Sequence, residues 1–260
     1  MLDETFSKSN AEFFSELSMN AYLPVEEFVD IYVDKYDIKF FDNGSTQCYS
    51  LWDERDLIYV FRGTEPTKLS DIEADIKFWK TGSETIGKVH HGFKEALDLI
   101  WEELYTHHDN NILIPLHYGY KLLFSKRKLR NVFFTGHSLG AALATLAAAR
   151  LGNELTQGYT YGSPRVGDKK FMNAFNPEFY RFRNNNDIVT RHPMELIGFK
   201  HIGLLNYFDN NGVHTCKCSR FFMFKQFVSG MFSGFFKLKI DSFSDHSSVK
   251  YNKLCKKFNS

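Results

Sequence analysis

The stretch "FFTGHSLGAALATLAAA", residues Phe133–Ala149, decides the fold. It begins as an apolar run, breaks into Gly-His-Ser-Leu-Gly and continues as a row of alanines and leucines. A short buried strand followed by a helix of small residues fits this pattern. Gly-x-Ser-x-Gly between a strand and a helix is the spacing of a nucleophile elbow, in which the serine sits on a strained turn. Ser138 is therefore the candidate nucleophile.

Ser138 has a second interpretation, as the N-cap of the helix that follows it. Serine is a favoured N-cap because its hydroxyl accepts a hydrogen bond from the first turn. A cap does not require glycine two residues away on both sides, as Gly136 and Gly140 are here. A cap also predicts no partner acid or histidine further along the chain. The elbow is the favoured interpretation.

The segments around this stretch alternate between strand and helix patterns. The segment Asp37–Gly63 is predicted to form a hairpin around Asn43-Gly44, followed by a third strand that ends near Phe61. Helices are expected at Asn10–Tyr22, ended by Pro24, at Gly92–His108, where apolar residues share one face, and at Leu139–Leu151. Further strands end in "YGSPRVG" and "RNNNDIV". We expect one α/β domain over residues 1–260, with a mostly parallel sheet and helices on both faces.

Composition and charge exclude several classes of protein. The 260 residues carry a formal net charge of only +1, and 43% are hydrophobic, which is typical of a globular protein. The N-terminus lacks the apolar core of a signal peptide, and the densest apolar stretch, residues 226–236, is too short to span a bilayer. We therefore expect a cytoplasmic or peripheral membrane enzyme, or one exported without a signal peptide. The basic residues near the C-terminus alternate with apolar ones, which disfavours nucleic-acid binding.

Cysteine and histidine spacing gives little support for a metal site. The four cysteines are Cys48, Cys216, Cys218 and Cys255. His214 with Cys216 and Cys218 could begin a zinc site, but no second cluster completes four ligands. We expect free thiols, no metal and no cofactor.

An elbow serine needs a histidine base and an acid that orients it, and on this scaffold they follow in the order serine, acid, histidine. Asp187 comes after a predicted strand, at the sheet edge where open α/β sheets place their sites. Asp168 and Asp209 are the rival acids. His246, in "SDHSS" near the chain end, is the favoured base, and the rival bases are His192, His201 and His214. The residues alone leave these choices open.

Five stretches, in order, make the sequence resemble the class 3, fungal-type lipase family of serine esterases with the α/β-hydrolase fold. They are "VFRGTE" (60–65), "VHHGF" (89–93), "TGHSLGAALA" (135–144), "YGSPRVGD" (161–168) and "RFRNNNDIVTRHP" (181–193), with "DHSS" closing. The resemblance implies Ser138 as nucleophile, Asp187 as acid and His246 as base. It also implies an oxyanion hole formed by Thr64 and the backbone N–H of Leu139.

The turn that carries Thr64, in "VFRGTE", is called the oxyanion turn below. The segment after it is predicted to be a helix near residues 66–80. Its apolar residues recur at three- and four-residue steps, and Ser70 to Glu73 has the form of a capping box. In the family this position is similar to a lid that covers the site, so Leu69, Ile72, Ile76 and Trp79 are the candidate lid residues. The alternative is a fixed helix packed on the core.

An apolar, basic insertion near residues 219–240 separates Asp187 from His246. As a helix it would place an aromatic face beside lysines, which is typical of a helix lying in a membrane interface. The candidate membrane-binding residues are Phe224, Phe227, Phe232, Phe235, Lys225 and Lys237. A buried helix or two core strands are the alternative.

The expected function is hydrolysis of lipid esters, either glycerides or phospholipids, at a membrane or lipid surface. A phospholipase A and a lipase for partial glycerides compete with a triacylglycerol lipase. A protein of another class, a catalytically silent hydrolase fold that binds membranes or regulates a partner, is the alternative. The sequence has all four residues that the family implies for catalysis, which favours the enzyme. They are Ser138, Asp187, His246 and Thr64.

Overall fold

The computed structural model describes residues 2–64, 79–113, 129–152, 156–215 and 244–260. The predicted lid residues Leu69, Ile72 and Ile76 and the whole predicted insertion lie outside these ranges.

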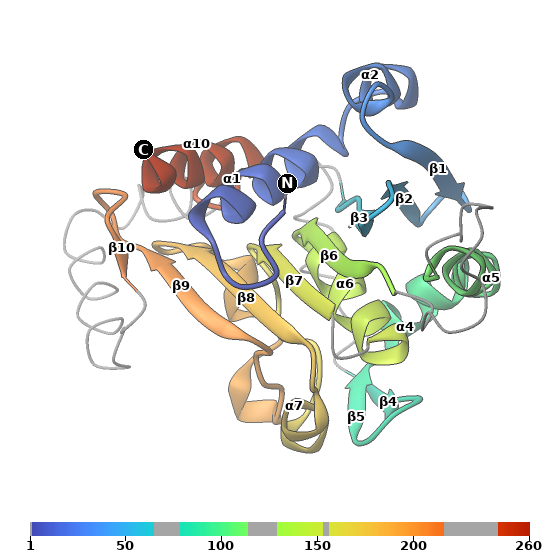
Figure 1. The fold of residues 1–260 in the computed structure, drawn as a ribbon. Coiled ribbons are helices and arrows are strands. Elements are labelled where there is room, and N and C mark those ends of the chain that lie inside the picture. The colour runs from blue at the N-terminus through green and yellow to red at the C-terminus, as the bar shows by residue number, and fades with distance from the viewer. Residues whose placement is uncertain (1, 65–78, 114–128, 153–155, 216–243) are drawn as a thin grey trace.

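An eight-stranded mixed sheet forms the centre of the described chain, in the order β1-β2-β3-β6-β7-β8-β9-β10 (Figure 1). In this sheet β3, β6, β7, β8 and β9 run parallel to one another, and β1, β2 and β10 are antiparallel to their neighbours. A separate small sheet pairs β4 with β5. The strands are β1 (Asp37–Asp42), β2 (Gln47–Trp52), β3 (Asp56–Phe61), β4 (Lys80–Gly82), β5 (Lys88–His90), β6 (Asn131–His137), β7 (Thr156–Tyr161), β8 (Glu178–Asn184), β9 (Leu204–Phe208) and β10 (His214–Thr215).

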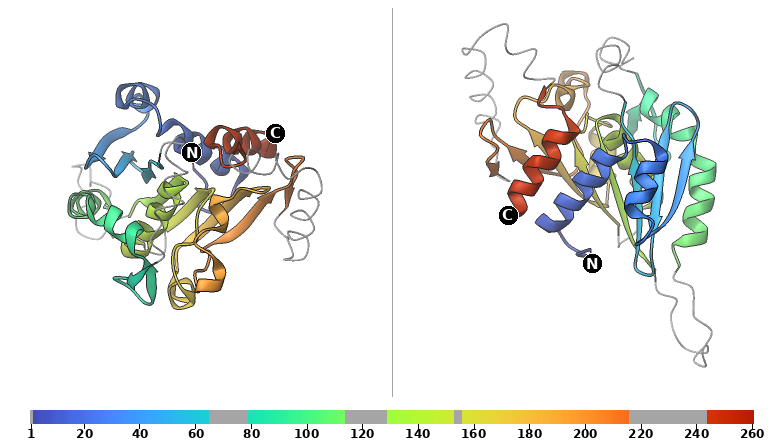
Figure 2. Two further views of the ribbon diagram at one scale, coloured as in Figure 1. Left: turned by 180° about the vertical axis from the view of Figure 1, so that it is seen from behind. Right: turned by 90° about the horizontal axis from the view of Figure 1, so that it is seen from above.

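Helices cover both faces of the large sheet. Helices α1 and α10 lie side by side on one face, and α4 and α6 pack on the other (Figures 1 and 2). The helices are α1 (Lys8–Asn20), α2 (Val25–Tyr32), α4 (His91–Asp98), α5 (Trp101–Asn111), α6 (Leu139–Leu151), α7 (Lys169–Ala174) and α10 (Ser248–Asn259), with short 3-10 turns η2 (Val189–Arg191) and η3 (Glu195–Ile197).

Strand β6 separates the two hydrophobic cores. Val132 and Phe134 pack into the core under α4 and α6, whereas Phe133 packs against α1. Because successive side chains of a strand point to opposite faces, an almost wholly apolar strand such as β6 must be buried on both sides. This arrangement brings the end of β6, and the elbow, to the middle of the sheet.

Most predicted elements match the structure, and the differences concern the end of the first helix, an additional helix α2 and the helix expected over Gly92–His108. The helix over Leu139–Leu151, the hairpin and the third strand are confirmed. The first helix ends at Asn20, and Pro24 is the N-cap of α2, which was not predicted. The single helix expected over Gly92–His108 is wrong: it breaks into α4 and α5 at Leu99 and Ile100, and the turn keeps Ile100 and Leu104 buried.

Candidate active site

Ser138 lies at the sharp turn between β6 and α6. Its φ is 60° and its ψ is −128°, a region that costs a non-glycine residue about 1–3 kcal/mol. Ser138 occupies the N-cap position of α6, yet its side chain makes no capping hydrogen bond. Its backbone N–H instead donates to the carbonyl of Tyr161 in β7 at 3.0 Å. The interpretation of Ser138 as a helix cap is therefore wrong, and its hydroxyl is left for another use.

The two glycines of the elbow are required by close backbone contacts. A Cβ on Gly136 would lie 2.4 Å from the carbonyl carbon of Gly140. A Cβ on Gly140 would lie 2.1 Å from the carbonyl oxygen of Phe61 in β3. Side chains do not fit at either distance, so the glycines let α6 approach β3 and β6 closely enough to form the strained turn.

His246 and Asp187 form a buried hydrogen-bonded pair. The Nδ1 of His246 donates to the two carboxylate oxygens of Asp187 at 3.0 and 2.9 Å, and the side chains are 1% and 0% exposed. Since Nδ1 carries the proton in this contact, the neutral ring presents a lone pair at Nε2. That Nε2 is buried and has no hydrogen-bond partner among the described residues. The ring lies 4.5 Å from the ring of His137, the residue before Ser138, so a proton acceptor is held beside the elbow.

The carboxylate of Asp187 stays ionised although it is fully buried. Burial by itself would raise the pKa of Asp187, but the facing His246 ring and the hydrogen bonds from His246 and Tyr251 hold the pKa below its usual range. The Val189 backbone N–H also donates to Asp187 Oδ1 at 2.9 Å. A buried carboxylate with three donors can orient an imidazole and stabilise the cation formed when that imidazole takes a proton.

The oxyanion turn packs directly against the elbow. A Cβ on Gly63 would lie 3.2 Å from the Cβ of Ser138 and 2.4 Å from the carbonyl oxygen of His137. Thr64 follows Gly63 and is partly buried. Leu139 is the first residue of α6, where backbone N–H groups have no acceptor inside the helix. Of the two predicted oxyanion-hole residues, Leu139 therefore directly follows Ser138, and Thr64 directly follows a glycine that lies against it.

Comparison with known proteins agrees with this geometry. The family model described as lipase (class 3) matches residues 58–197, which is more than half of the chain. The matched span includes the oxyanion turn, the elbow and Asp187. The chain belongs to the class 3 lipase family. His246 lies beyond the matched span, so its place beside Asp187 is a finding of the structure alone.

Curated relatives of the chain come from plants and fungi. The chain is 28% identical to the triacylglycerol lipase OBL1 of Arabidopsis thaliana, over 75% of the chain and 48% of that protein. It is 39% identical to the secreted mono- and diacylglycerol lipase 1 of Fusarium solani, over 44% of the chain and 32% of that protein. The chain spans about half or less of the length of these two relatives.

A solved structure shares the fold. The triacylglyceride lipase of Rhizomucor miehei superimposes with a TM-score of 0.63 at 25% identity, covering 81% of this chain and 84% of the other. The fold of this member of the class 3 lipase family is the α/β-hydrolase fold, as the sequence motifs predicted.

Tyr251 is a site residue that the sequence did not reveal. Its hydroxyl donates to Asp187 Oδ2 at 2.6 Å and accepts from the Asn184 backbone N–H at 2.9 Å. Tyr251 is 1% exposed and lies in the first turns of α10. Only the packing of α10 against the end of β8 makes this tyrosine a partner of Asp187, so no local pattern could have identified it.

The three asparagines before Asp187 connect its loop to the loop of His246. The Nδ2 of Asn184 donates to the Asp245 carbonyl at 2.9 Å. The Nδ2 of Asn185 and the backbone N–H of Asn186 donate to Asp245 Oδ2 at 3.1 and 3.3 Å. Because Asp245 immediately precedes His246, these contacts fix the distance between the acid and the base.

His137 holds the His246 loop from the other side. Its Nε2 donates to the backbone carbonyl of His246 at 2.5 Å, so its Nδ1 accepts from the Tyr22 hydroxyl at 3.0 Å. Burial, with a further contribution from His246, lowers the pKa of His137 to about 3. His137 therefore stays neutral in this orientation and acts as a positioning residue.

The rival acids perform local structural tasks. Asp168 caps α7 and accepts from the Phe171 N–H at 2.9 Å. Asp209 accepts from the N–H groups of Asn211 and Val213 at 2.9 and 2.8 Å in the turn before β10. Neither carboxylate is among the groups that contact His246.

The rival histidines lie elsewhere in the fold. The Nδ1 of His192 contacts the Ile188 carbonyl at 3.1 Å, and the Nε2 of His214 contacts Asn206 Oδ1 at 2.9 Å. His201 lines a separate cavity with Arg181 and Arg183. His246 is the histidine that the structure pairs with Asp187.

Trp79 and Lys80, the described residues of the predicted lid segment, are not helical. Trp79 is 70% exposed, and its carbonyl accepts from the His91 N–H at 2.9 Å. Lys80 begins β4 and pairs with His90. These backbone pairings at Trp79 and Lys80 exclude a helix there, so Trp79 is not a residue of a lid helix. The other candidate lid residues and the membrane-binding residues of 219–240 lie outside the described chain.

Cys48 and Cys255 are free and buried, as expected of reduced thiols. Cys216 and Cys218 lie outside the described chain. Within the described ranges no cluster of three His, Cys, Asp or Glu side chains could hold a metal ion. No helix in those ranges has both the length and the apolar character needed to cross a bilayer.

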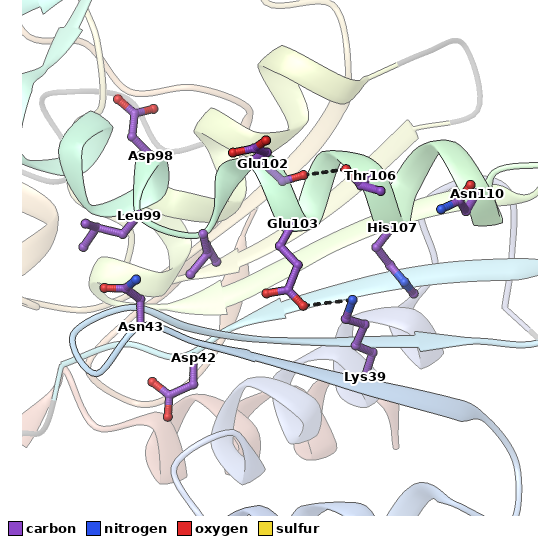
Figure 3. A pocket seen from close by; sticks show the side chains of 11 residues that line it. Lys39, Asp42, Asn43, Asp98, Leu99, Glu102, Glu103, Thr106, His107 and Asn110 are labelled. Atoms are coloured by element: carbon purple, nitrogen blue, oxygen red, sulfur yellow. Dashed lines mark hydrogen bonds and ion pairs between the residues drawn. The ribbon is translucent and has the colours of Figure 1, made fainter.

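A cavity of about 510 Å³ lies between the β1–β2 hairpin and the α4–α5 region (Figure 3). None of the side chains lining it belongs to Ser138, Asp187 or His246. Its central cation, Lys39, is paired with Glu103 at 2.9 Å. This cavity is therefore distinct from the candidate active site, and its described lining carries four carboxylates, on Asp42, Asp98, Glu102 and Glu103, against the single cation of Lys39.

Proposed function

We propose that this class 3 lipase is a serine carboxylic ester hydrolase that cleaves lipid esters through Ser138, Asp187 and His246. The observation that carries the proposal is the buried Asp187–His246 pair, whose Nε2 is held beside a strained elbow serine without another hydrogen-bond partner in the described chain. A silent hydrolase fold would have no need to keep this proton acceptor buried and oriented.

The chemistry follows from these positions. His246 Nε2 takes the hydroxyl proton as Ser138 Oγ attacks the ester carbonyl, and Asp187 stabilises the imidazolium. Thr64 and the Leu139 N–H stabilise the tetrahedral oxyanion. The intermediate collapses, His246 gives its proton to the departing alcohol, and an acyl-enzyme remains. Water, activated by His246, then hydrolyses the acyl-enzyme and releases a carboxylic acid. The reaction requires no cofactor or metal.

Glycerides are the favoured substrate class. The curated relatives are named triacylglycerol lipases and mono- and diacylglycerol lipases, which supports a glyceride ester over a phospholipid. The basic and aromatic sequence of residues 219–240 supports action at a membrane or lipid surface, with Phe224, Phe227, Phe232 and Phe235 as the inserted side chains and Lys225 and Lys237 at the headgroups. A phospholipase A activity is the second candidate, because the same lysines favour an anionic lipid surface.

The test compares the wild type with Ser138→Ala on a soluble short-chain ester, a glyceride emulsion and phospholipid vesicles. We expect Ser138→Ala to lose at least about 10⁴-fold in kcat on any substrate that the wild type cleaves. An unchanged Tm for the variant would show that the loss is chemical. A variant as active as the wild type would refute Ser138 as nucleophile, and a wild type silent on all three substrates would favour the non-catalytic alternative. The ratio of glyceride to phospholipid rates assigns the substrate class.

A further inference from the structure

A second cavity, of about 350 Å³, lies on the face of the sheet formed by β8 and β9. Strand β8 contributes Arg181 and Arg183, and β9 contributes Leu205. Side chains from the loop after β7, from α7 and from residues 195–201 complete the wall. They are Arg165, Met172, Glu195, Lys200 and His201. A volume of this size lies within the range of small-molecule sites, at its lower end.

The lining of this cavity is strongly cationic. Among the described residues that line it, four side chains are arginine or lysine, and one, Glu195, is a carboxylate. Lys200 Nζ forms an ion pair with the Glu195 carboxylate at 2.7 Å. Arg165 donates to the backbone carbonyls of Arg191 and Pro193, which carry no net charge. Glu195 also acts on Arg165, because its charge opposes the lowering of the Arg165 pKa by burial. No carboxylate of the described lining forms an ion pair with Arg181.

Arg181 is the most unusual of these residues. It is only 7% exposed, and its Nε is buried with no hydrogen-bond partner among the described residues. Burial, with repulsion from Arg183 and Arg165, lowers the pKa of Arg181 to about 9. A buried guanidinium destabilises the folded protein unless an anion accepts its hydrogen bonds.

The residue directly opposite Arg181 explains why no internal partner reaches it. Strands β8 and β9 are parallel, and their register pairs Arg181 with Leu205. Both side chains line the cavity, so they share one face of the sheet. An apolar side chain thus stands where a carboxylate would neutralise Arg181 across the strands.

His201 gives the wall a further unused polar group. Both of its ring nitrogens are buried without a well-formed hydrogen bond in the described chain, although the nearby Thr190 carbonyl acts to raise its pKa. Burial and the three arginines outweigh that contact and hold the pKa of His201 well below its usual range. A neutral imidazole can donate one hydrogen bond to an anion that enters the cavity.

The cavity of Figure 3 differs from this one in the charge of its lining side chains. There Lys39 is paired with Glu103, and Asp42, Asp98 and Glu102 also line the wall. That cavity has no excess of positive charge. The cationic wall on β8 and β9 is therefore a local property, since the whole chain carries a formal net charge of only +1.

We propose that the cavity lined by Arg165, Arg181 and Arg183 is an anion site that binds a phosphate group, either as free phosphate or as part of a phosphorylated ligand. Guanidinium groups donate pairs of hydrogen bonds to phosphate oxygens, and a phosphate has enough oxygens to serve more than one arginine. The bound anion accepts a hydrogen bond from Arg181 Nε, which has no partner in the described chain. None of the lining residues is Ser138, Asp187 or His246, so the site is separate from the proposed ester hydrolysis and does not depend on it.

The decisive variant is Leu205→Glu, which places a carboxylate opposite Arg181, with Leu205→Gln as its neutral control of the same shape. Thermal unfolding is followed at rising inorganic phosphate, with sodium chloride holding the ionic strength constant. For the wild type and Leu205→Gln we expect a saturable rise in Tm of about 5 °C at phosphate near 100 times Kd. For Leu205→Glu we expect no rise, and a Tm without phosphate above that of Leu205→Gln.

A second variant keeps the test informative if Leu205→Glu does not fold. Arg181→Gln removes the unpartnered guanidinium, and we expect it to raise the Kd for inorganic phosphate, measured by isothermal titration calorimetry, by at least about tenfold. Arg55→Gln, on a half-buried arginine that lies 3.8 Å from Glu4 and does not line the cavity, is the matched control and should leave Kd unchanged. Two results overturn the proposal. One is equal phosphate binding by the wild type, Leu205→Glu and Arg181→Gln. The other is a wild type that shows saturable binding of neither inorganic phosphate nor dihexanoyl phosphatidylglycerol.

The source of the phosphate is resolved with a second ligand in the Ser138→Ala background, which prevents hydrolysis. Dihexanoyl phosphatidylglycerol below its aggregation concentration is compared with inorganic phosphate. Stabilisation by the lipid alone, lost in Leu205→Glu, assigns the cavity to a lipid headgroup. Stabilisation by both assigns it to the phosphate group itself. Stabilisation by the lipid that persists in Leu205→Glu places lipid binding elsewhere and counts against the cavity.

Discussion

Removing the Tyr251 hydroxyl tests whether α10 holds the acid of the candidate site. Tyr251→Phe keeps the ring and deletes the 2.6 Å hydrogen bond to Asp187 Oδ2, together with the acceptor for the Asn184 N–H. Tyr251 is too deeply buried to touch a substrate. Any effect on turnover must therefore pass through the orientation or the charge of Asp187.

The magnitude follows from the contacts that are lost. A hydrogen bond to a charged group contributes about 1.5–3 kcal/mol to stability, and the stranded Asn184 N–H costs about a further 1 kcal/mol. We expect the free energy of unfolding of Tyr251→Phe at pH 7 to fall by about 2.5–4 kcal/mol. If half of the hydrogen-bond energy orients His246 through Asp187, kcat falls by about 4- to 12-fold with KM unchanged.

The pH dependence of the loss has a defined sign. The Tyr251 hydrogen bond helps to depress the pKa of Asp187 in the folded protein. A carboxyl group with a depressed pKa stabilises the fold above its unfolded pKa of about 3.9, and this stability is lost as the pH falls through the folded pKa. The stability difference between the wild type and Tyr251→Phe should stay constant from pH 8 to pH 5 and narrow below about pH 4.

Urea unfolding followed by tryptophan fluorescence, with kinetics on a soluble ester, measures both effects. Tyr32→Phe is the matched control, because the buried Tyr32 hydroxyl accepts a hydrogen bond from the neutral Asn20 side chain at 2.9 Å and contacts no carboxylate in the described part of the chain. It should lose stability without losing kcat. A Tyr251→Phe variant with wild-type kcat, or with a stability loss that does not narrow at low pH, would refute the assignment of Tyr251 to Asp187.

Three further substitutions probe the frame around the site. Gly162→Ala would place a carbon 2.9 Å from the His246 ring at a φ of 61°, and we expect kcat/KM on a soluble ester to fall by at least about 100-fold. Normal kinetics would show that the ring is not held there. Asp245→Ala removes the acceptor of the Asn185 side chain, and we expect kcat to fall several-fold with KM unchanged, measured in the same assay. Gly140→Ala would press a methyl group against a backbone oxygen of β3 at 2.1 Å, and we expect a loss of stability above about 4 kcal/mol in urea unfolding; a small loss would mean that the elbow can relax.

Local sequence determined the elements whose cause is local. The strand, turn and helix around Ser138 follow from an apolar run, two glycines and a row of alanines, because each acts within a few residues of the next. The hairpin around Asn43-Gly44 was predictable for the same reason. The order of motifs also determined the family, and with it the expected fold.

Tertiary structure decided which distant residues meet. Asp187 and His246 are 59 positions apart, and their pairing depends on the end of β8, the Asn184–Asn186 run and the start of α10 coming together. The break at Leu99 and Ile100 arises because burial against the sheet overrides the helical pattern. The cationic cavity exists because the register of β8 and β9 sets Leu205 opposite Arg181. A strand's register is set by contacts between segments far apart in the chain, and no single stretch of sequence contains them.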